Sequence, residues 1–162
     1  FVDVHLSFEL VTSRACTGIL LYLNQTPIDW YCKKQSTVAC ATFGSEFVAA
    51  KTATEKAYDL RYTLRMMGIP VDYQTYVFGD NAAVITQYTI PHSQLGKQHN
   101  ALAYHFTRKA SATGMIHMFH VAGIDNPASC MTKFLGYQEW IQILRPVLFW
   151  QGNTATIPTK GE

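Results

Sequence analysis

The chain has 162 residues, of which 48% are apolar, 13% aromatic and 15% charged, a composition that supports one globular domain with its own core. Its formal charge of +2 permits a nucleic-acid partner without arguing for one. The longest apolar runs, 18–23 and 146–150, fall far short of the ~20 residues of a membrane-spanning helix. We therefore expect no membrane partner.

Two further features bear on where the protein acts. The chain begins with Phe1 rather than Met and carries no basic-then-apolar leader, so we expect a piece of a longer polypeptide. Its four cysteines lack C-x-x-C spacing, which is typical of reduced, mostly buried thiols in an intracellular protein.

The first third of the chain has β-type patterns. Apolar and other residues alternate over 1–6, as in a half-buried strand, and this places Asp3 on an exposed sheet position. A compact apolar run over 16–23 is followed by turn residues at 24–27 and by β-type composition over 28–32. These segments predict three strands joined as hairpins.

A long helix is predicted next. Residues that recur at spacings of three and four would form one stripe along this helix: Glu46, Ala50, Ala53, Ala57, Leu60, Leu64 and Met67. Gly68 and Pro70 end it. An unpaired Glu46 at the start of this stripe would be costly to bury, so we expect a cation or donor nearby. The alternative is that Glu46 stays hydrated in the first turn and complements the helix dipole.

In the rest of the chain, predicted strands are separated by predicted helices. A strand over 74–79 ends in Asp80 and Asn81, where ligands gather in open α/β sheets; the alternative is that Asp80 is an N-cap. We then predict a short helix from 82, a helix over 99–112, a strand over 115–121, and helices that begin at Asn126-Pro127 and continue over 137–144.

This order predicts an α/β domain with a mixed five-stranded sheet, whose first three strands form an antiparallel meander, and helices packed on it. We place the domain at 1–145 and a C-terminal tail at 146–162. Asp3, Glu46 and Asp80 lie at element boundaries or sheet positions where they could converge. Converging carboxylates are what a two-metal phosphodiester hydrolase uses to bind Mg²⁺.

Several blocks carry a family resemblance. Ser13 to Gly18 resembles an R-S-T-S-G-Y stretch, and 27–39, with Lys33-Lys34-Gln35, is similar to I-S-W-x-S-K-K-Q-x-T-V-A. Further matches are S-E-F-V-A at 45–49 to A-E-Y-V-A, 67–70 to L-G-I-P, 78–81 to a C-D-N motif, 97–99 to K-H-I and 104–106 to Y-H-F. These residues resemble the ribonuclease H domain of copia-type retrotransposon Pol polyproteins over about residues 1–144.

The resemblance implies a ribonuclease H-like fold with helices on both faces of the sheet, and cleavage of the RNA strand of RNA/DNA hybrids. It implies Asp3, Glu46 and Asp80 as ligands of Mg²⁺, with Mn²⁺ as a substitute. The matched blocks also imply nucleic-acid contacts, through Lys33, Lys34, Gln35 and Asn81. The implied partner is the reverse transcriptase domain of the same polyprotein, in a cytoplasmic virus-like particle or the nucleus.

One position departs from the family. Its A-D-x-x-T-K motif corresponds to residues 128–133, where Ser129 replaces the fourth carboxylate, and a hydroxyl is a poorer Mg²⁺ ligand. Asp125 lies one helical turn earlier but outside the predicted helix. A second hypothesis is therefore a catalytically decayed domain that binds nucleic acid or supports the polymerase. An integrase-like phosphoryl transferase is a third, against which the K-K-Q-S-T-V-A block argues.

Two other groups have alternative interpretations. His117 and His120, three apart on a strand, point to opposite faces and cannot share an ion, so we interpret both as half-buried side chains. Trp30 is either a core residue or a contact for a nucleic-acid backbone beside the lysines at 33 and 34.

Overall fold

The computed structural model describes residues 1–6, 14–36, 42–90 and 101–145, and it is a mixed α/β structure. The strands in this part are β1 (Val2–His5), β2 (Cys16–Leu23), β3 (Thr26–Lys34), β4 (Thr75–Gly79) and β5 (Ile116–His120). The helices are α1 (Thr42–Met66), α2 (Ala82–Thr89), α3 (Ala101–Ala112), α4 (Ser129–Thr132) and α5 (Tyr137–Leu144), with a short 3₁₀ turn, η2 (Gly123–Asp125). Their order confirms the predicted succession of elements.

The first three strands form an antiparallel sheet in the order β1-β2-β3, as predicted. The β2–β3 hairpin turns at Asn24, whose φ of 56° is a left-handed conformation that asparagine tolerates. The turn is shorter than the sequence suggested, because Thr26 and Pro27 already belong to β3.

The prediction of one five-stranded sheet is wrong in one respect. β4 and β5 pair with each other in parallel as a separate two-stranded sheet. Phe1 and Leu20 exchange both backbone hydrogen bonds, so the backbone of Val2, one residue on, faces away from β2. The Val2 carbonyl accepts a hydrogen bond of 2.9 Å from Asn126 Nδ2. A side chain therefore satisfies a group that could otherwise have joined the sheets.

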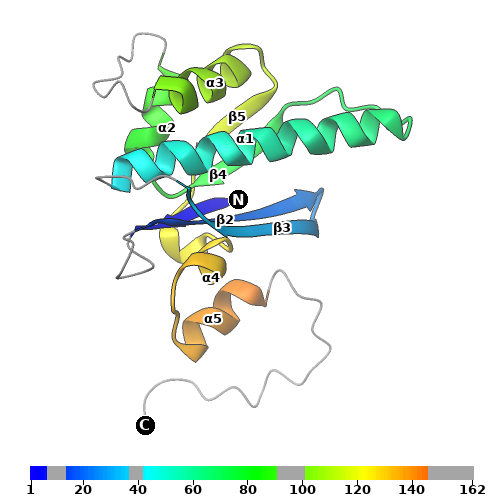
Figure 1. Ribbon diagram of the computed structural model, residues 1–162. Coiled ribbons are helices and arrows are strands. Elements are labelled where there is room, and N and C mark those ends of the chain that lie inside the picture. The colour runs from blue at the N-terminus through cyan, green and yellow to red at the C-terminus, as the bar shows by residue number, and fades with distance from the viewer. Residues whose placement is uncertain (7–13, 37–41, 91–100, 146–162) are drawn as a thin grey trace.

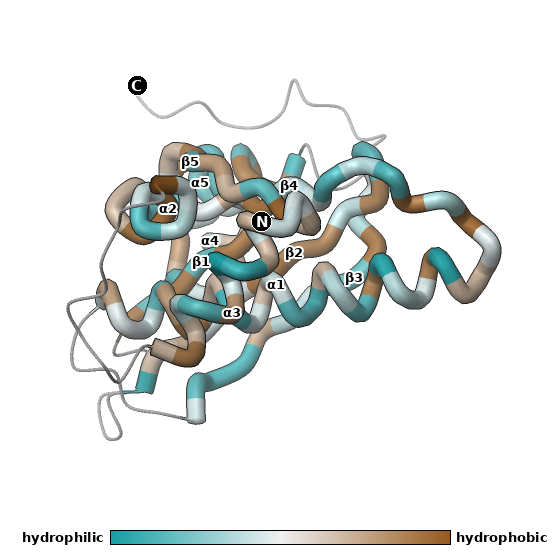
Figure 2. Tube along the Cα trace, turned by 90° about the horizontal axis from the view of Figure 1, so that it is seen from above, coloured by the Kyte–Doolittle hydropathy of each residue, from teal (hydrophilic) through white to brown (hydrophobic). Residues whose placement is uncertain are grey.

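Helices lie on both faces of the three-stranded sheet (Figure 1). α1, α2 and α3 lie on one side with β4 and β5, and α4 and α5 lie on the other. Along α1, hydrophobic and hydrophilic residues alternate (Figure 2), as expected for a helix with one buried stripe. Within the described residues, no helix has the length and apolar character needed to cross a membrane.

Most of the predicted stripe of α1 packs into the core, but Met67 lies beyond the end of the helix and is 69% exposed, so its inclusion was wrong. Ala50, Ala53, Ala57 and Leu64 are buried, and the helix stops before Gly68, whose φ of +78° suits glycine. On the same helix, Phe47 is fully buried and packs edge-on against Tyr88 of α2 and Tyr104 of α3. These contacts fix the N-terminal half of α1, and with it Glu46, over the sheet.

The segment after β5 differs from the prediction. Instead of starting a helix, Asn126 is fully buried and serves as a bridge: its Nδ2 donates to the Val2 carbonyl and its Oδ1 accepts from the Ala128 amide at 3.1 Å. The helix begins only at Ser129. The side-chain bonds of Asn126 hold the start of α4 against β1.

The cysteines are only partly as expected. The three described ones are free thiols: Cys16 is buried, Cys130 is half-buried and Cys32 is exposed. The prediction of burial is therefore wrong for Cys32, which lies on the outer strand β3. Cys40 lies outside the described residues.

Candidate active site

Asp3 lies at the centre of the candidate site. It faces Gly18 across the β1–β2 pair and is fully buried, so the expectation of an exposed sheet position is wrong. The reason is α4, which packs directly on this face. A Cβ on Gly18 would lie 2.7 Å from Thr132 Cγ2 and 3.0 Å from the Ala128 carbonyl oxygen, so only glycine lets α4 approach this closely.

Both carboxylate oxygens of Asp3 are hydrogen-bonded. The Thr132 hydroxyl donates to Oδ2, and Lys133 Nζ donates to Oδ1 at 3.0 Å. Burial raises the pKa of Asp3, and the bonds from Thr132 and Lys133 and the lysine charge oppose that shift. Asp3 is therefore held in place by Thr132 of α4 and by Lys133, the residue after this helix, which lie 129 and 130 residues further along the chain.

Asp80 follows β4 and lies beside the same lysine. Its Oδ2 is 3.5 Å from Lys133 Nζ, and its side chain is 21% exposed. It is not the N-cap of α2, because Asn81 has that role, with Oδ1 accepting from the Val84 amide at 3.2 Å. The Asp80 carboxylate is therefore not used as a helix cap, and it contacts Lys133 in the candidate site instead.

Glu46 is the fifth residue of α1 and is half-buried, rather than hydrated in the first turn. Burial raises its pKa to about 8, with further contributions from the negative charges of Asp80 and Asp3 and a partly compensating one from Lys133. Lys133 acts on Glu46 only through its charge, because its described contacts are with Asp3, Asp80 and Ser129. These electrostatic effects place three carboxylates, from β1, α1 and the end of β4, within mutual influence.

Ser129 lies in the same cluster, 1% exposed. Its Oγ accepts from Lys133 Nζ at 3.3 Å and donates to the Gly123 carbonyl at 3.4 Å. Asp125 does not compensate for the missing carboxylate: it is exposed on η2, and no described contact joins it to Asp3, Asp80 or Lys133.

The donor set has the chemistry for one divalent cation. Carboxylate oxygens are the ligands that Mg²⁺ and Mn²⁺ take, and Asp3, Glu46 and Asp80 would supply them. Within the described ranges, however, no three His, Cys, Asp or Glu side chains are drawn together closely enough to hold a metal ion, and Lys133 Nζ stands between Asp3 and Asp80. A second cation, beside residue 129, does not fit, because Ser129 offers only a neutral hydroxyl there.

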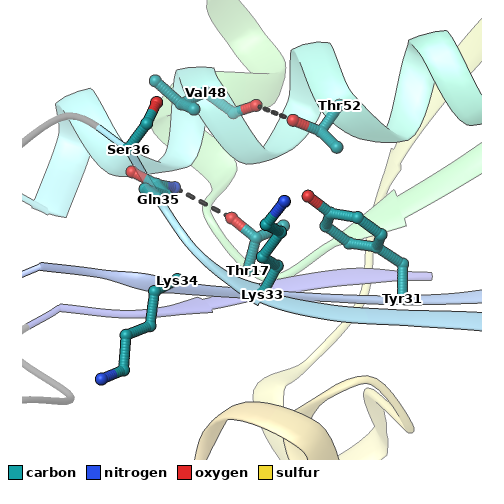
Figure 3. Close-up of a pocket in the computed structure, with 8 residues that line it drawn as sticks. All are labelled: Thr17, Tyr31, Lys33, Lys34, Gln35, Ser36, Val48 and Thr52. Atoms are coloured by element: carbon teal, nitrogen blue, oxygen red, sulfur yellow. Dashed lines mark hydrogen bonds between the residues drawn. The ribbon is translucent and has the colours of Figure 1, made fainter.

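The predicted nucleic-acid residues lie at the edge strand β3. A hollow of about 160 Å³ is lined by Lys33, Lys34 and Gln35 together with Thr17, Tyr31, Ser36, Val48 and Thr52. Figure 3 shows Lys33 and Tyr31 directed towards α1, while Lys34 extends towards the opposite side of the strand, as neighbours on a strand do. The lysines therefore flank the sheet edge, and Lys33 is not on the face that carries Asp3.

Gln35 and Asn81, which we predicted to contact nucleic acid, also have structural roles. Gln35 is 6% exposed, and its Nε2 donates to Thr17 Oγ1 at 2.9 Å and to the Ser45 carbonyl at 2.8 Å. It thus joins β2 to the start of α1. Asn81 caps α2. Their predicted contacts with nucleic acid stay predictions.

The sequence did not point to two residues that bond to Asp3, namely Thr132 and Lys133. Both belong to the T-K end of the motif that contains Ser129, and they follow it by three and four residues, which is one helical turn. That spacing was the available signal.

The histidines and Trp30 can also be placed. His117 is half-buried as expected, whereas His120 is exposed, with Nε2 lying 3.1 Å from the Asp80 backbone oxygen. Trp30 is 70% exposed on β3, so it is not a core residue.

The comparisons with known proteins point to retrotransposons. The chain is 28% identical over 118 residues to "Retrovirus-related Pol polyprotein from transposon RE2" of Arabidopsis thaliana, and 27% identical over 118 residues to the corresponding RE1 protein of the same plant. These matches cover 72% of this chain and 8% of each relative. No family model and no solved structure matches. The chain is thus a distant homologue of a short segment of retrotransposon Pol polyproteins.

Proposed function

We propose that this chain is a ribonuclease H-like domain that hydrolyses the RNA strand of RNA/DNA hybrids with a divalent cation during reverse transcription. The observation that carries the proposal is that Asp3 of β1 and Asp80 at the end of β4 share the ammonium group of Lys133, while Glu46 of α1 lies near enough for their negative charges to raise its pKa. Distant homology to retrovirus-related Pol polyproteins supports the broader part of the proposal, a role within a retrotransposon Pol protein.

Each side chain has a distinct part in this proposal. Asp3, Glu46 and Asp80 would hold Mg²⁺ or Mn²⁺, and the bound ion would stabilise negative charge on the oxygens of the scissile phosphodiester. Thr132 orients the Asp3 carboxylate through its hydrogen bond. Lys33 and Lys34, on opposite sides of the β3 edge, would bind phosphates of the hybrid. The proposed partner in the polyprotein is the reverse transcriptase domain, and the proposed location is a cytoplasmic virus-like particle or the nucleus.

Cleavage of a labelled RNA/DNA hybrid in Mg²⁺ and in Mn²⁺ tests this function. We expect the unmodified chain to cut the RNA strand and Asp80→Asn to lose at least about 100-fold in rate, since it removes a charged ligand from the site. Asp72→Asn, at an exposed aspartate outside the site, is the matched control and should keep full activity. Cleavage by Asp80→Asn at the unmodified rate would exclude the proposal.

A second candidate is a decayed domain that binds hybrid without cutting it, and the neutral, buried Ser129 favours it. The same assay separates the two. If only Ser129→Asp cuts the hybrid, the chain is a nuclease scaffold that has lost its chemistry; if the unmodified chain cuts, the decayed reading is excluded.

A further inference from the structure

Two thiols of neighbouring strands lie in contact on the face of the sheet against which α4 packs. Cys16 of β2 and Cys32 of β3 have their Sγ atoms 3.6 Å apart. The register places Gly18 opposite Cys32, so the opposite position carries no side chain and leaves room for the Cys32 thiol to lean diagonally towards Cys16. Because a disulfide holds its two sulfurs about 2.05 Å apart, these sulfurs need to approach each other by only about 1.5 Å.

The two thiols differ in their access to solvent. Cys32 is exposed, whereas Cys16 is 3% exposed. Burial, followed by the contact with Cys32, raises the pKa of Cys16 to about 12, so this thiol stays protonated near neutral pH. Since the thiolate is the reactive form in thiol–disulfide exchange, an external disulfide reaches and reacts with Cys32 first. The sulfur of Cys32 is then within reach of Cys16.

Cys32 also connects this pair of thiols to the candidate active site. Its Sγ donates a hydrogen bond of 3.2 Å to the Met131 carbonyl of α4. Met131 precedes Thr132, whose hydroxyl is bonded to the Asp3 carboxylate. A disulfide sulfur carries no hydrogen, so oxidation of Cys32 removes its hydrogen bond to α4. The redox state of the pair therefore acts on the helix that holds Asp3.

We propose that Cys16 and Cys32 are a redox-sensitive pair, which a small-molecule disulfide converts reversibly into an intrachain disulfide that loosens α4. The inference does not rest on the proposed function, because it concerns only the two thiols and the packing of α4.

The exchange takes place in two steps. Cys32 loses its proton and attacks one sulfur of the small-molecule disulfide, which forms a mixed disulfide and expels the other sulfur as a thiolate. Cys16 then loses its proton and attacks the Cys32 sulfur, which closes the protein disulfide and expels the second thiolate. The two thiolates take up the two protons. The protein is thus oxidised by two electrons, and the small-molecule disulfide is reduced to two thiols.

Mass spectrometry of the whole chain after treatment with glutathione disulfide tests the pairing. The background is the double variant Cys40→Ser/Cys130→Ser, in which only the two proposed thiols remain. We expect this variant to lose two hydrogen atoms and to keep no glutathione, and a dithiol reductant should reverse the change. Adding Cys16→Ser should stop the reaction at a mixed disulfide on Cys32. Adding Cys32→Ser instead should slow the loss of thiol at least about tenfold, because only the buried Cys16 is then left to react.

Amide hydrogen exchange tests the effect on α4. The amides of Met131 and Lys133 donate to carbonyls of residues 128 and 129. We expect both to exchange at least about threefold faster in the oxidised form of the background variant than in its reduced form, because α4 has lost a contact with β3. The amides of α3, on the other face of the sheet (Figure 1), should be unchanged. Cys32→Ala, which lacks the donor, should show the faster exchange of α4 without oxidation.

Three results would overturn the inference: no reaction at Cys32, a mixed disulfide that persists although Cys16 is present, or equal exchange of the α4 amides in the reduced and oxidised forms. None of these measurements involves hybrid cleavage. A chain that cuts no hybrid but forms this disulfide and loosens α4 would disprove the proposed activity and leave the redox pair established.

Discussion

Glu46 is a carboxyl group that the fold keeps partly protonated near neutral pH. Burial, followed by the charges of Asp80 and Asp3, raises its pKa from 4.5 to about 8. Because the folded state binds this proton more tightly than the unfolded state, the contribution of Glu46 to stability is fully present below pH 4.5 and is lost as pH rises through about 8.

We therefore predict that the chelator-treated protein loses stability between about pH 4.5 and pH 8, and that Glu46→Gln removes much of this dependence. Urea midpoints at several pH values measure it for both proteins. The difference between the two curves isolates Glu46 from Asp3, whose pKa is also raised by burial. Parallel curves would show that Glu46 does not carry the effect.

Gly18 is the second residue on which the site depends. Gly18→Ala would place a Cβ 2.7 Å from Thr132 Cγ2, so α4 must shift away from β2. We expect a loss of about 1–3 kcal/mol in the free energy of unfolding, measured by urea denaturation. Gly79→Ala is the control, because a Cβ there would meet Val2 Cγ1 at an ordinary 3.5 Å. An equal loss in both variants would contradict this account.

At the scale of elements, Arg61 fastens the C-terminal half of α1 to the approach to β4. It is 7% exposed, and its guanidinium donates to the carbonyls of Val71 and Tyr73 and to Thr75 Oγ1. These bonds fix the segment that leads from the long helix to the strand carrying Asp80.

We predict that Arg61→Met costs about 2 kcal/mol in the free energy of unfolding, because it removes three hydrogen bonds to partly buried acceptors. Arg65→Met is the matched control: Arg65 makes one exposed bond of 3.4 Å to the Val71 carbonyl, and its loss should cost about 0.5 kcal/mol or less. Thermal or urea denaturation measures both. Similar losses would mean that the buried network of Arg61 does not anchor the helix.

At the scale of the whole molecule, the low net charge of +2 limits how much of hybrid binding can be electrostatic. Any phosphate contacts must come from local groups, and Lys33 and Lys34 at the β3 edge are the proposed ones. Each phosphate contact steepens the dependence of affinity on salt.

We predict that replacing both Lys33 and Lys34 by glutamine weakens hybrid binding and reduces the slope of log affinity against log salt by about 1–2. Fluorescence anisotropy across a salt series measures this slope. Lys109→Gln, at an exposed lysine on α3, should leave it unchanged. An unaltered slope in the double variant would remove these lysines from the proposed interface.

Local patterns in the sequence were enough to predict the succession of strands and helices, because hydrophobic period and turn residues are local signals. The stripe of α1 and the meander of β1 to β3 followed from such patterns. It also determined that Asp3, Glu46 and Asp80 were candidates, since each lies at a predictable place on its element.

Contacts between residues far apart in the chain could be learned only from the folded structure. Asn126 bonds to the Val2 carbonyl across 124 residues, and Lys133 bonds to Asp3 across 130 residues. The strands lie in two sheets rather than one. Local periodicity carries no information about such distant pairs. Whether Asp3 faces water, a metal ion or an ammonium group depends on the packing of α4 over Gly18, and packing is a property of the assembled chain.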